Sequence, residues 1–275
     1  RGAKVYVTRR LPEGAMALLE KAKEVAELRV NPYDRVATRR ELKDGVLWCD
    51  CLLCLLTDKV DAELMDWNPS LRIIANYAVG FNNIDVAAAT ERRIPVTNTP
   101  GVLTETSADM AWALLMACAR RVAEGDAMMR SGKFKGWGPL MLLGRDVYGK
   151  TLGLVGLGRI GYAMARRAQG FDMRVLYTSP RRVDERLEKS VGARHVDLKT
   201  VLRESDFVSL HPYLNESTRH LIGERELKLM KSTAFLINTS RGPVVDEHAL
   251  VTALQEGWIA GAALDVFEEE PKMAP

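Results

Sequence analysis

Three glycines spaced as Gly-x-Gly-x-x-Gly are the first residues of this sequence with a recognisable chemical use. Gly156, Gly158 and Gly161 follow the apolar run TLGLV and precede a helix-like run. In that context the first glycine permits a tight turn, the second lets the backbone approach a pyrophosphate, and the third lets helix and strand pack closely. Phosphate oxygens then meet free N–H groups at the amino end of the helix. We predict that a dinucleotide binds Gly156, Gly158, Arg159, Ile160 and Gly161.

The next apolar run ends in Ser179-Pro180-Arg181-Arg182, without a carboxylate at the strand end. An acidic residue about 20 positions after the glycines normally accepts a hydrogen bond from the 2′-hydroxyl of NAD. A hydroxyl and two guanidiniums suit a 2′-phosphate instead, because charged donors strengthen hydrogen bonds to phosphate. We expect NADP(H) to be preferred and NAD(H) to be possible. The alternative is a solvated arginine pair on a surface loop.

Two later runs end in charged residues. TAFLINTS runs into Arg241, and IAGAALDV runs into the acidic stretch from Glu268 to Glu270. Ligands of open α/β sheets bind beyond the carboxyl ends of the strands. There an arginine can grip a carboxylate and polarise a carbonyl, and a carboxylate can orient an imidazole. A strand-end ion pair and a solvated acidic turn would suit these positions equally well.

The elements that must position these residues form two α/β series. Strand-like runs alternate with helical stretches, which predicts two parallel-sheet domains, residues 1–99 and residues 100–275. Between the series, residues 103–130 predict one apolar helix that is buried between domains or against a second subunit, and residues 131–150 predict a loop. The expected strands lie at 3–8, 44–56, 71–76, 94–98, 151–156, 173–178, 206–211, 233–240 and 259–267. The expected helices of the first series lie at 14–23 and 62–66.

Composition excludes several classes of function. A formal net charge of +3 does not indicate a nucleic-acid partner. The longest uncharged apolar run, residues 110–119, is far shorter than the about 20 residues of a membrane span, so we expect no membrane partner and a soluble protein. Four cysteines are too few for a disulfide framework, and we interpret the run around Cys49, Cys51 and Cys54 as a buried strand and not as a metal site. We expect a cytoplasmic location and no metal.

Five ordered motifs resemble the D-isomer-specific 2-hydroxyacid dehydrogenases over essentially the whole chain, most closely the glyoxylate/hydroxypyruvate reductases. The motifs are ANYAVGFNNID from Ala75, TNTPGVLTETSAD from Thr97, VYGKTLGLVGLGRIG from Val147, NTSRGPVVDE from Asn238 and GAALDVFEEEP from Gly261. The resemblance implies two flavodoxin-like or Rossmann-like domains, with the nucleotide domain inserted into the substrate domain. It also implies active sites in the cleft and a homodimer formed through the nucleotide domain.

The resemblance also implies roles for individual residues. Arg241 would bind the 2-oxo acid, and Glu270 would support a catalytic histidine. The N–H groups of Val79 and Gly80 would hold the substrate carboxylate, with Leu55 lining the pocket. The remaining cofactor contacts would be Thr106, Thr239, Ser240 and, at the nicotinamide amide, Asp265.

Two features depart from the family pattern. The usual His-x-Pro after the fourth nucleotide-domain strand is His211-Pro212-Tyr213 here, and the Pro-His-x-Gly motif of the proton donor is not found. We therefore expect that the carboxyl end of the natural chain is missing from this sequence. We expect the histidines that are present to be surface or loop residues: His195, His211, His220 and His248.

The reaction implied is NADPH-dependent reduction of a small 2-oxo acid, glyoxylate or hydroxypyruvate, to the D-2-hydroxy acid. A phosphoglycerate, D-lactate or formate dehydrogenase is an alternative on the same frame. A non-catalytic NAD(P)H-sensing protein, similar to the family's corepressors, is an alternative of a different class.

Overall fold

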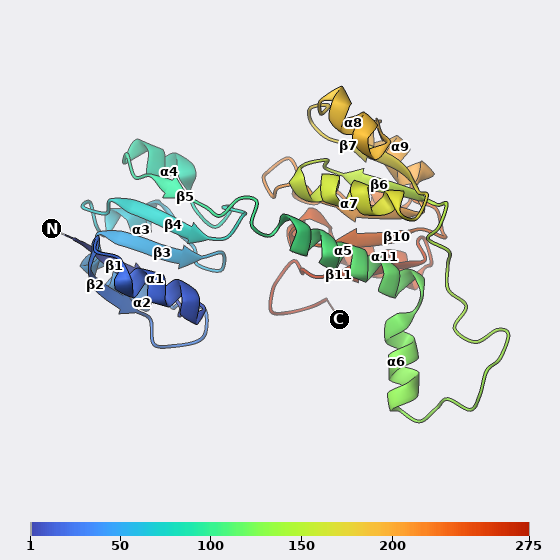
Figure 1. Cartoon of the computed structure of the whole chain (residues 1–275), viewed down its shortest axis with the longest axis horizontal. Helices are drawn as coiled ribbons and strands as arrows, with labels where there is room; N and C mark the ends of the chain where they lie inside the picture. The colour runs from blue at the N-terminus through green and yellow to red at the C-terminus, as the bar shows by residue number, and fades with distance from the viewer. Residues whose placement is uncertain (1, 275) are drawn as a thin grey trace. The chain divides into compact units, whose positions relative to one another are not determined.

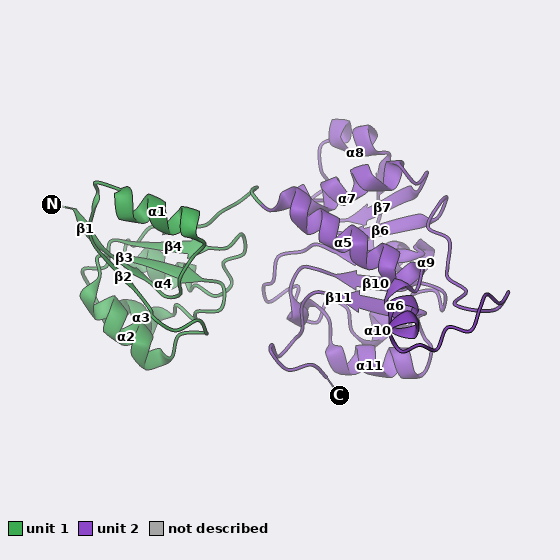
Figure 2. Cartoon of the chain, turned by 60° about the horizontal axis from the view of Figure 1, so that its bottom comes forward, with its two compact units in different colours: residues 1–102 green, residues 103–275 purple. Residues whose placement is uncertain are grey.

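The computed structural model describes residues 2–274, and the chain divides into two compact units, residues 1–102 and residues 103–275 (Figure 2). Each unit contains one parallel sheet with helices on its faces, so the predicted fold class is confirmed. Within residues 2–274, no helix is both long enough and apolar enough to cross a membrane.

The sheet of the first unit has five parallel strands in the order β2-β1-β3-β4-β5 (Figure 1). The elements are β1 (Ala3–Val7), α1 (Glu13–Lys21), β2 (Val25–Val30), α2 (Arg39–Trp48), β3 (Cys51–Leu55), α3 (Ala62–Asp66), β4 (Ile73–Tyr77), α4 (Val86–Glu91) and β5 (Val96–Thr97). Tyr6 faces one buried cluster, and its neighbours Val5 and Val7 face another on the opposite side. The strand order reverses between β1 and β3, so their carboxyl ends mark the edge where sheets of this type bind ligands.

The strand predicted at residues 44–56 is wrong in its first half, because residues 39–48 form α2 and only Cys51–Leu55 form β3. A capping box starts α2: the side chain of Thr38 accepts from the N–H of Glu41, whose carboxylate accepts from the N–H of Thr38. The apolar face of α2 and the buried strand β3 follow each other closely, so they merge into one apolar run. Cys49 and Cys54 are buried, and burial raises the pKa of each thiol to about 12.

The sheet of the second unit has six parallel strands in the order β11-β10-β9-β6-β7-β8, that of a Rossmann nucleotide-binding sheet. Its first elements are α5 (Thr104–Ala119), α6 (Val122–Arg130), β6 (Thr151–Val155), α7 (Arg159–Gln169), β7 (Arg174–Thr178), α8 (Glu185–Val191) and β8 (Ala193–His195). They are followed by α9 (Leu198–Glu204), β9 (Phe207–Leu210), α10 (Glu224–Leu227), β10 (Phe235–Asn238), the 3-10 helix η1 (Gly242–Val244), α11 (Glu247–Gln255) and β11 (Gly261–Leu264). The strand order reverses between β6 and β9.

The single helix predicted for residues 103–130 is wrong, because two helices form there. Arg121, with a φ of +53°, separates α5 from α6. Ala108, Ala111 and Leu115 of α5 are buried in the core of their own unit, whereas Met110 is 46% exposed. The burial expected for this helix is therefore supplied in part by the sheet that it covers.

An arm, defined as α6 and residues 131–143, stands away from the sheet of the second unit (Figure 1). No residue of α6 is buried, and residues 131–150 contain no helix or strand, as predicted for this loop. Trp137 and Leu140 are each 82% exposed. The arm thus presents large apolar side chains to its surroundings.

Candidate active site

The three motif glycines form the turn from β6 to α7. Gly156 has a φ of +99°, and a Cβ at this position would lie 2.9 Å from the carbonyl oxygen of His211. A Cβ on Gly161 would lie 2.1 Å from the carbonyl oxygen of Gly156, so these segments can touch only without a side chain. Gly158 has no heavy atom within 4 Å of the place that a Cβ would take. This open space fits the close approach of a pyrophosphate.

The amino end of α7 supplies donors for phosphate oxygens. Gly158 is the N-cap of α7, and its carbonyl accepts from the N–H of Tyr162 at 2.9 Å. The N–H groups of Arg159, Ile160 and Gly161 precede this bond and have no acceptor inside the helix. Free N–H groups at the positive end of a helix dipole attract phosphate, so the residues present fit the predicted dinucleotide.

The loop after β7 carries the predicted contacts to a 2′-phosphate. The N–H of Leu157 donates to Ser179 Oγ at 3.0 Å, which joins this loop to the glycine turn. The two arginines differ: Arg182 donates from Nε to Glu188 Oε1 at 2.8 Å and from Nη2 to Oε2 at 2.7 Å. Arg181 and Pro180 are exposed, and Arg181 makes no ion pair within residues 2–274.

The carboxylate of Glu188 is buried and receives a third hydrogen bond, from the hydroxyl of Tyr177. The hydrogen bonds from Arg182 and then Tyr177 lower the pKa of Glu188 to about 2. Arg182 therefore has a structural partner within the loop that was predicted to bind phosphate.

A turn after β10 presents Arg241. Asn238 ends the strand, is buried, accepts from the N–H of Ser240 at 3.0 Å and donates from Nδ2 to the carbonyl of Arg241 at 2.9 Å. These bonds close a short turn that contains Thr239 and Ser240. Arg241 is half-buried, and its Nη1 donates to the carbonyl of Ser240 at 2.7 Å.

Arg241 and Glu270 follow neighbouring strands, β10 and β11, and a glycine lets the segments that carry them pack together. A Cβ on Gly242 would lie 1.8 Å from the carbonyl oxygen of Phe267, so the two backbones pack directly. Glu270 Oε1 accepts from the N–H of Phe267 at 3.0 Å, which folds this carboxylate back toward the same contact. Burial lowers the pKa of Arg241, and the charge of Glu270 opposes that shift. The structure thus places a half-buried guanidinium within electrostatic reach of a carboxylate.

The other predicted cofactor residues lie at element ends. Asp265 follows β11, is exposed and donates its N–H to the carbonyl of Asn238 at 3.0 Å. Thr106 is exposed in the first turn of α5, and Thr239 is half-buried.

In the first unit, β4 ends in a loop that we call the cradle, residues 78–80, whose three carbonyls all accept hydrogen bonds. The donors are the N–H of Thr99 to Ala78 at 2.9 Å, Asn98 Nδ2 to Val79 at 2.8 Å and Asn76 Nδ2 to Gly80 at 2.9 Å. In a trans peptide the N–H lies opposite the carbonyl, so the N–H groups of Val79 and Gly80 point away from these donors. Neither donates a hydrogen bond within residues 2–274. Successive free N–H groups suit an anion such as a carboxylate.

Leu55 lies beside the cradle. It ends β3 and pairs with Tyr77, which ends β4, and its side chain is half-buried. The three predicted substrate residues of this unit therefore stand at the carboxyl ends of two adjacent strands.

Sequence reasoning missed the asparagines that hold these turns. Asn76, Asn98 and Asn238 each close an apolar run, in LRIIAN, IPVTN and TAFLIN. An asparagine at the carboxyl end of a strand can bond the following backbone and shape the turn. An asparagine that closes an apolar run is therefore the sequence feature that could have located these turns.

The histidines are not all surface or loop residues. His195 lies in β8 and is half-buried, which contradicts the prediction for that residue. Burial lowers the pKa of His211 to about 4. His220 is exposed and bonds to Glu268, and His248 is exposed.

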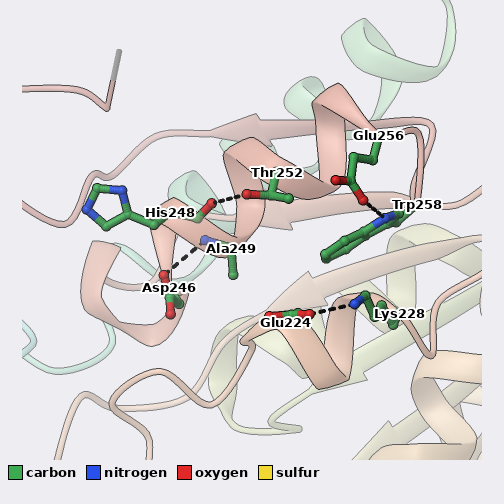
Figure 3. Close-up of a pocket in the computed structure, with 8 residues that line it drawn as sticks. All are labelled: Glu224, Lys228, Asp246, His248, Ala249, Thr252, Glu256 and Trp258. Carbon is green, nitrogen blue, oxygen red and sulfur yellow. Dashed lines mark hydrogen bonds and ion pairs between the residues drawn. The ribbon is translucent and has the colours of Figure 1, made fainter.

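A surface pocket of about 410 Å³ between α10 and α11 contains none of the predicted site residues (Figure 3). Its polar side chains bond to one another: Lys228 pairs with Glu224 and lies over the ring of Trp258, which donates to Glu256. Within residues 2–274, no group of three or more His, Cys, Asp or Glu side chains is placed to hold a metal ion.

Comparison with known proteins identifies the family. Residues 112–275 match the family model "D-isomer specific 2-hydroxyacid dehydrogenase, NAD binding domain". The glyoxylate reductase of Thermococcus litoralis is 56% identical over 272 residues, which cover 98% of this chain and 81% of that protein.

Two solved structures agree with this match. The TT0316 protein of Thermus thermophilus is 44% identical with a TM-score of 0.87, over 98% of this chain and 83% of that chain. A glyoxylate reductase from Paecilomyes thermophila is 33% identical with a TM-score of 0.89, over 100% of this chain and 84% of that chain. The nicotinamide cofactor implied by the resemblance is confirmed by the matched domain. The chain belongs to the D-isomer specific 2-hydroxyacid dehydrogenases.

Proposed function

We propose that this protein reduces glyoxylate to glycolate, or hydroxypyruvate to the corresponding D-2-hydroxy acid, with NADPH as the preferred cofactor. The observation that carries the proposal is that the close contact at Gly242 brings the segments of Arg241 and Glu270 together, so that the carboxylate acts on the guanidinium electrostatically. Relatives named glyoxylate reductase support this choice of substrate.

The residues have separate roles in this reaction. The free N–H groups of Val79 and Gly80 hold the substrate carboxylate, and Leu55 lines the pocket. When bound, the reduced nicotinamide supplies a hydride to the carbonyl carbon. Arg241 stabilises the negative charge that develops on the carbonyl oxygen, since a guanidinium stays charged at neutral pH even where burial lowers its pKa.

Glu270 prepares the proton transfer. A carboxylate that accepts from one ring nitrogen of a histidine fixes the ring and stabilises its charged form, which makes the imidazole a better-placed general acid. Glu270 has this role toward the family's Pro-His-x-Gly histidine, and none of the four histidines in residues 1–275 stands in that motif.

The choice of cofactor rests on Arg181. Its guanidinium is exposed beside Ser179 and Pro180, whereas Arg182 already binds Glu188 through two hydrogen bonds. Arg181 therefore contacts the 2′-phosphate of NADPH, and Arg182 shapes the loop. Arg181→Ala should weaken NADPH about tenfold and leave NADH nearly unchanged. Equal weakening of both cofactors would contradict the phosphate contact, and Arg182→Ala is the matched control.

We further infer a homodimer built through the arm. Apolar side chains such as Trp137 and Leu140 are 82% exposed on it, and a second copy would remove them from water. The mass in solution, measured by light scattering, should be twice that of the chain.

The four cysteines are unpaired thiols, which supports a reducing compartment such as the cytoplasm.

One experiment tests the activity. The protein, in a form that carries the Pro-His-x-Gly histidine, is mixed with glyoxylate, hydroxypyruvate, pyruvate or 3-phosphohydroxypyruvate, each with NADPH or NADH, and loss of the reduced cofactor is followed spectrophotometrically. The highest kcat/KM should be found with glyoxylate or hydroxypyruvate and NADPH. Turnover of none of these acids would refute the proposed function.

A further inference from the structure

Two segments that carry the substrate contacts of the first unit are joined by a pair of asparagines. Asn83 Nδ2 donates to Asn76 Oδ1, and Asn76 Nδ2 donates to Asn83 Oδ1, both at 3.3 Å. Asn76 also donates to the carbonyl of Gly80 at 2.9 Å. Asn83 also donates to the carbonyl of Leu55 at 3.1 Å. This amide pair therefore connects the end of β3 to the cradle after β4.

The same asparagine reaches a second anchor. The carbonyl of Asp58 lies 3.1 Å from Asn83 Nδ2, so the two N–H groups of this amide are shared among Asn76 Oδ1 and the carbonyls of Leu55 and Asp58. The buried carboxylate of Asp58 accepts from the N–H of Leu55 at 2.8 Å and from the hydroxyl of Thr8 at 2.5 Å. Thr8 follows β1 and is fully buried, so the ends of β1, β3 and β4 share one network.

Backbone pairing extends this connection. The N–H of Val60 donates to the carbonyl of Asn83 at 2.8 Å, and the N–H of Asp85 donates to the carbonyl of Val60 at 2.9 Å. Buried amides that lose their partners cost free energy, so the network resists a change in the spacing of its segments. A carboxylate bound by two backbone N–H groups is sensitive to that spacing, because misplacement of about 1 Å can cost a factor of about 100 in rate.

We propose that Asn83 is a positioning residue for substrate: through Asn76 and Leu55 it sets the distance between the cradle and the pocket wall. The proposal rests on the proposed function, because it takes the cradle as the carboxylate site. Asn83 acts through the backbone and takes no part in the hydride or proton transfer. Its loss should therefore change the binding of the 2-oxo acid and leave the nucleotide-binding unit unaffected.

The chain contains a matched control. Asn68 is half-buried like Asn83, and its Nδ2 also donates to two carbonyls, those of Val46 and Cys49, each at 2.7 Å. It lies before β4 and joins the segment before β3, at the opposite edge of the same sheet. Asn68→Ala therefore removes a similar number of hydrogen bonds far from the cradle.

The test compares Asn83→Ala and Asn68→Ala in the protein form that carries the Pro-His-x-Gly histidine. For Asn83→Ala we expect kcat/KM for glyoxylate to fall about 10- to 100-fold, mainly through KM, with an unchanged Kd for NADPH by fluorescence titration. Asn68→Ala should lower Tm with an unchanged KM. Asn83→Ser keeps one hydrogen-bond donor, so its kcat/KM should lie between those of wild type and Asn83→Ala. It replaces the alanine variant in the test if that variant does not fold.

Hydrogen exchange gives a second readout that needs no turnover. The amides of Leu55 and Thr99, which donate to Asp58 Oδ2 and to the carbonyl of Ala78, should exchange faster in Asn83→Ala, or in Asn83→Ser, than in Asn68→Ala at equal global stability. An unchanged KM together with unchanged exchange would overturn the positioning role while the wild-type chain still reduces glyoxylate. If the wild-type chain reduces no 2-oxo acid, the proposed function fails, and the exchange data alone decide whether Asn83 holds the cradle.

Discussion

The carboxyl edges of the two sheets both present backbone N–H groups suited to an anion, but they are held by different means. In the first unit, side-chain amides of Asn76, Asn83 and Asn98 bond the carbonyls around the cradle. In the second unit, backbones touch directly where glycines leave room, at Gly161 and Gly242. The first edge is therefore weakened by removing polar side chains, and the second by adding a Cβ. The second edge also carries the half-buried guanidinium of Arg241.

The largest expected effect comes from replacing the guanidinium of Arg241 by the ammonium group of lysine. Lysine keeps the charge of Arg241 but loses the planar fork, so Arg241→Lys should lower kcat about 10²- to 10³-fold. Steady-state kinetics with glyoxylate measure the loss, and an unchanged Kd for NADPH is the control. If Arg241→Lys retained most of kcat/KM, a positive charge without the planar fork would be sufficient for the reaction.

The next prediction distinguishes the roles of two glycines in one turn, Gly158 and Gly161, by replacing each with serine. Gly161→Ser places a Cβ against the carbonyl of Gly156, and overpacking of this kind should cost about 1–3 kcal/mol of unfolding free energy in urea. Gly158→Ser meets open space and supplies a favourable N-cap, so stability should be maintained while NADPH binds more weakly. Equal stability losses for the two variants would contradict the distinct roles of the glycines.

The smallest expected effect concerns the pair of Arg182 and Glu188. Because the pKa of Glu188 in the folded chain is about 2, below its ordinary value of 4.5, the pair stabilises the fold above about pH 4.5. That contribution is lost as the pH falls toward 2. Arg182→Ala should be slightly less stable than wild type at pH 7, because the exposed guanidinium is screened by solvent, and the difference should disappear in acid. A loss of stability in Arg182→Ala that did not depend on pH would contradict the role of the pair with Glu188. Arg181→Ala, the control, should show no pH-dependent loss of stability.

Sequence reasoning located most strands and the strand-end turns because these signals are local. It missed β2 and β8, which lie at sheet edges where Glu27, Arg29 and Arg194 interrupt the apolar pattern. It merged α2 with β3 because a buried helix face and a buried strand are both apolar. It missed the break at Arg121, because left-handed backbone in a non-glycine residue has no reliable sequence signature.

The sequence alone identified the glycine motif and the charged residues that follow β10 and β11. It could do so because a tight turn and a strand end are each determined by a few consecutive residues. The sharing of Asn83 between two strand ends, the pairing of Arg182 with Glu188 and the approach of Arg241 to Glu270 depended on tertiary structure. Such contacts join segments whose separation is set by how helices and strands pack. A hydrogen bond depends on tenths of an ångström, which residue spacing along the chain does not encode.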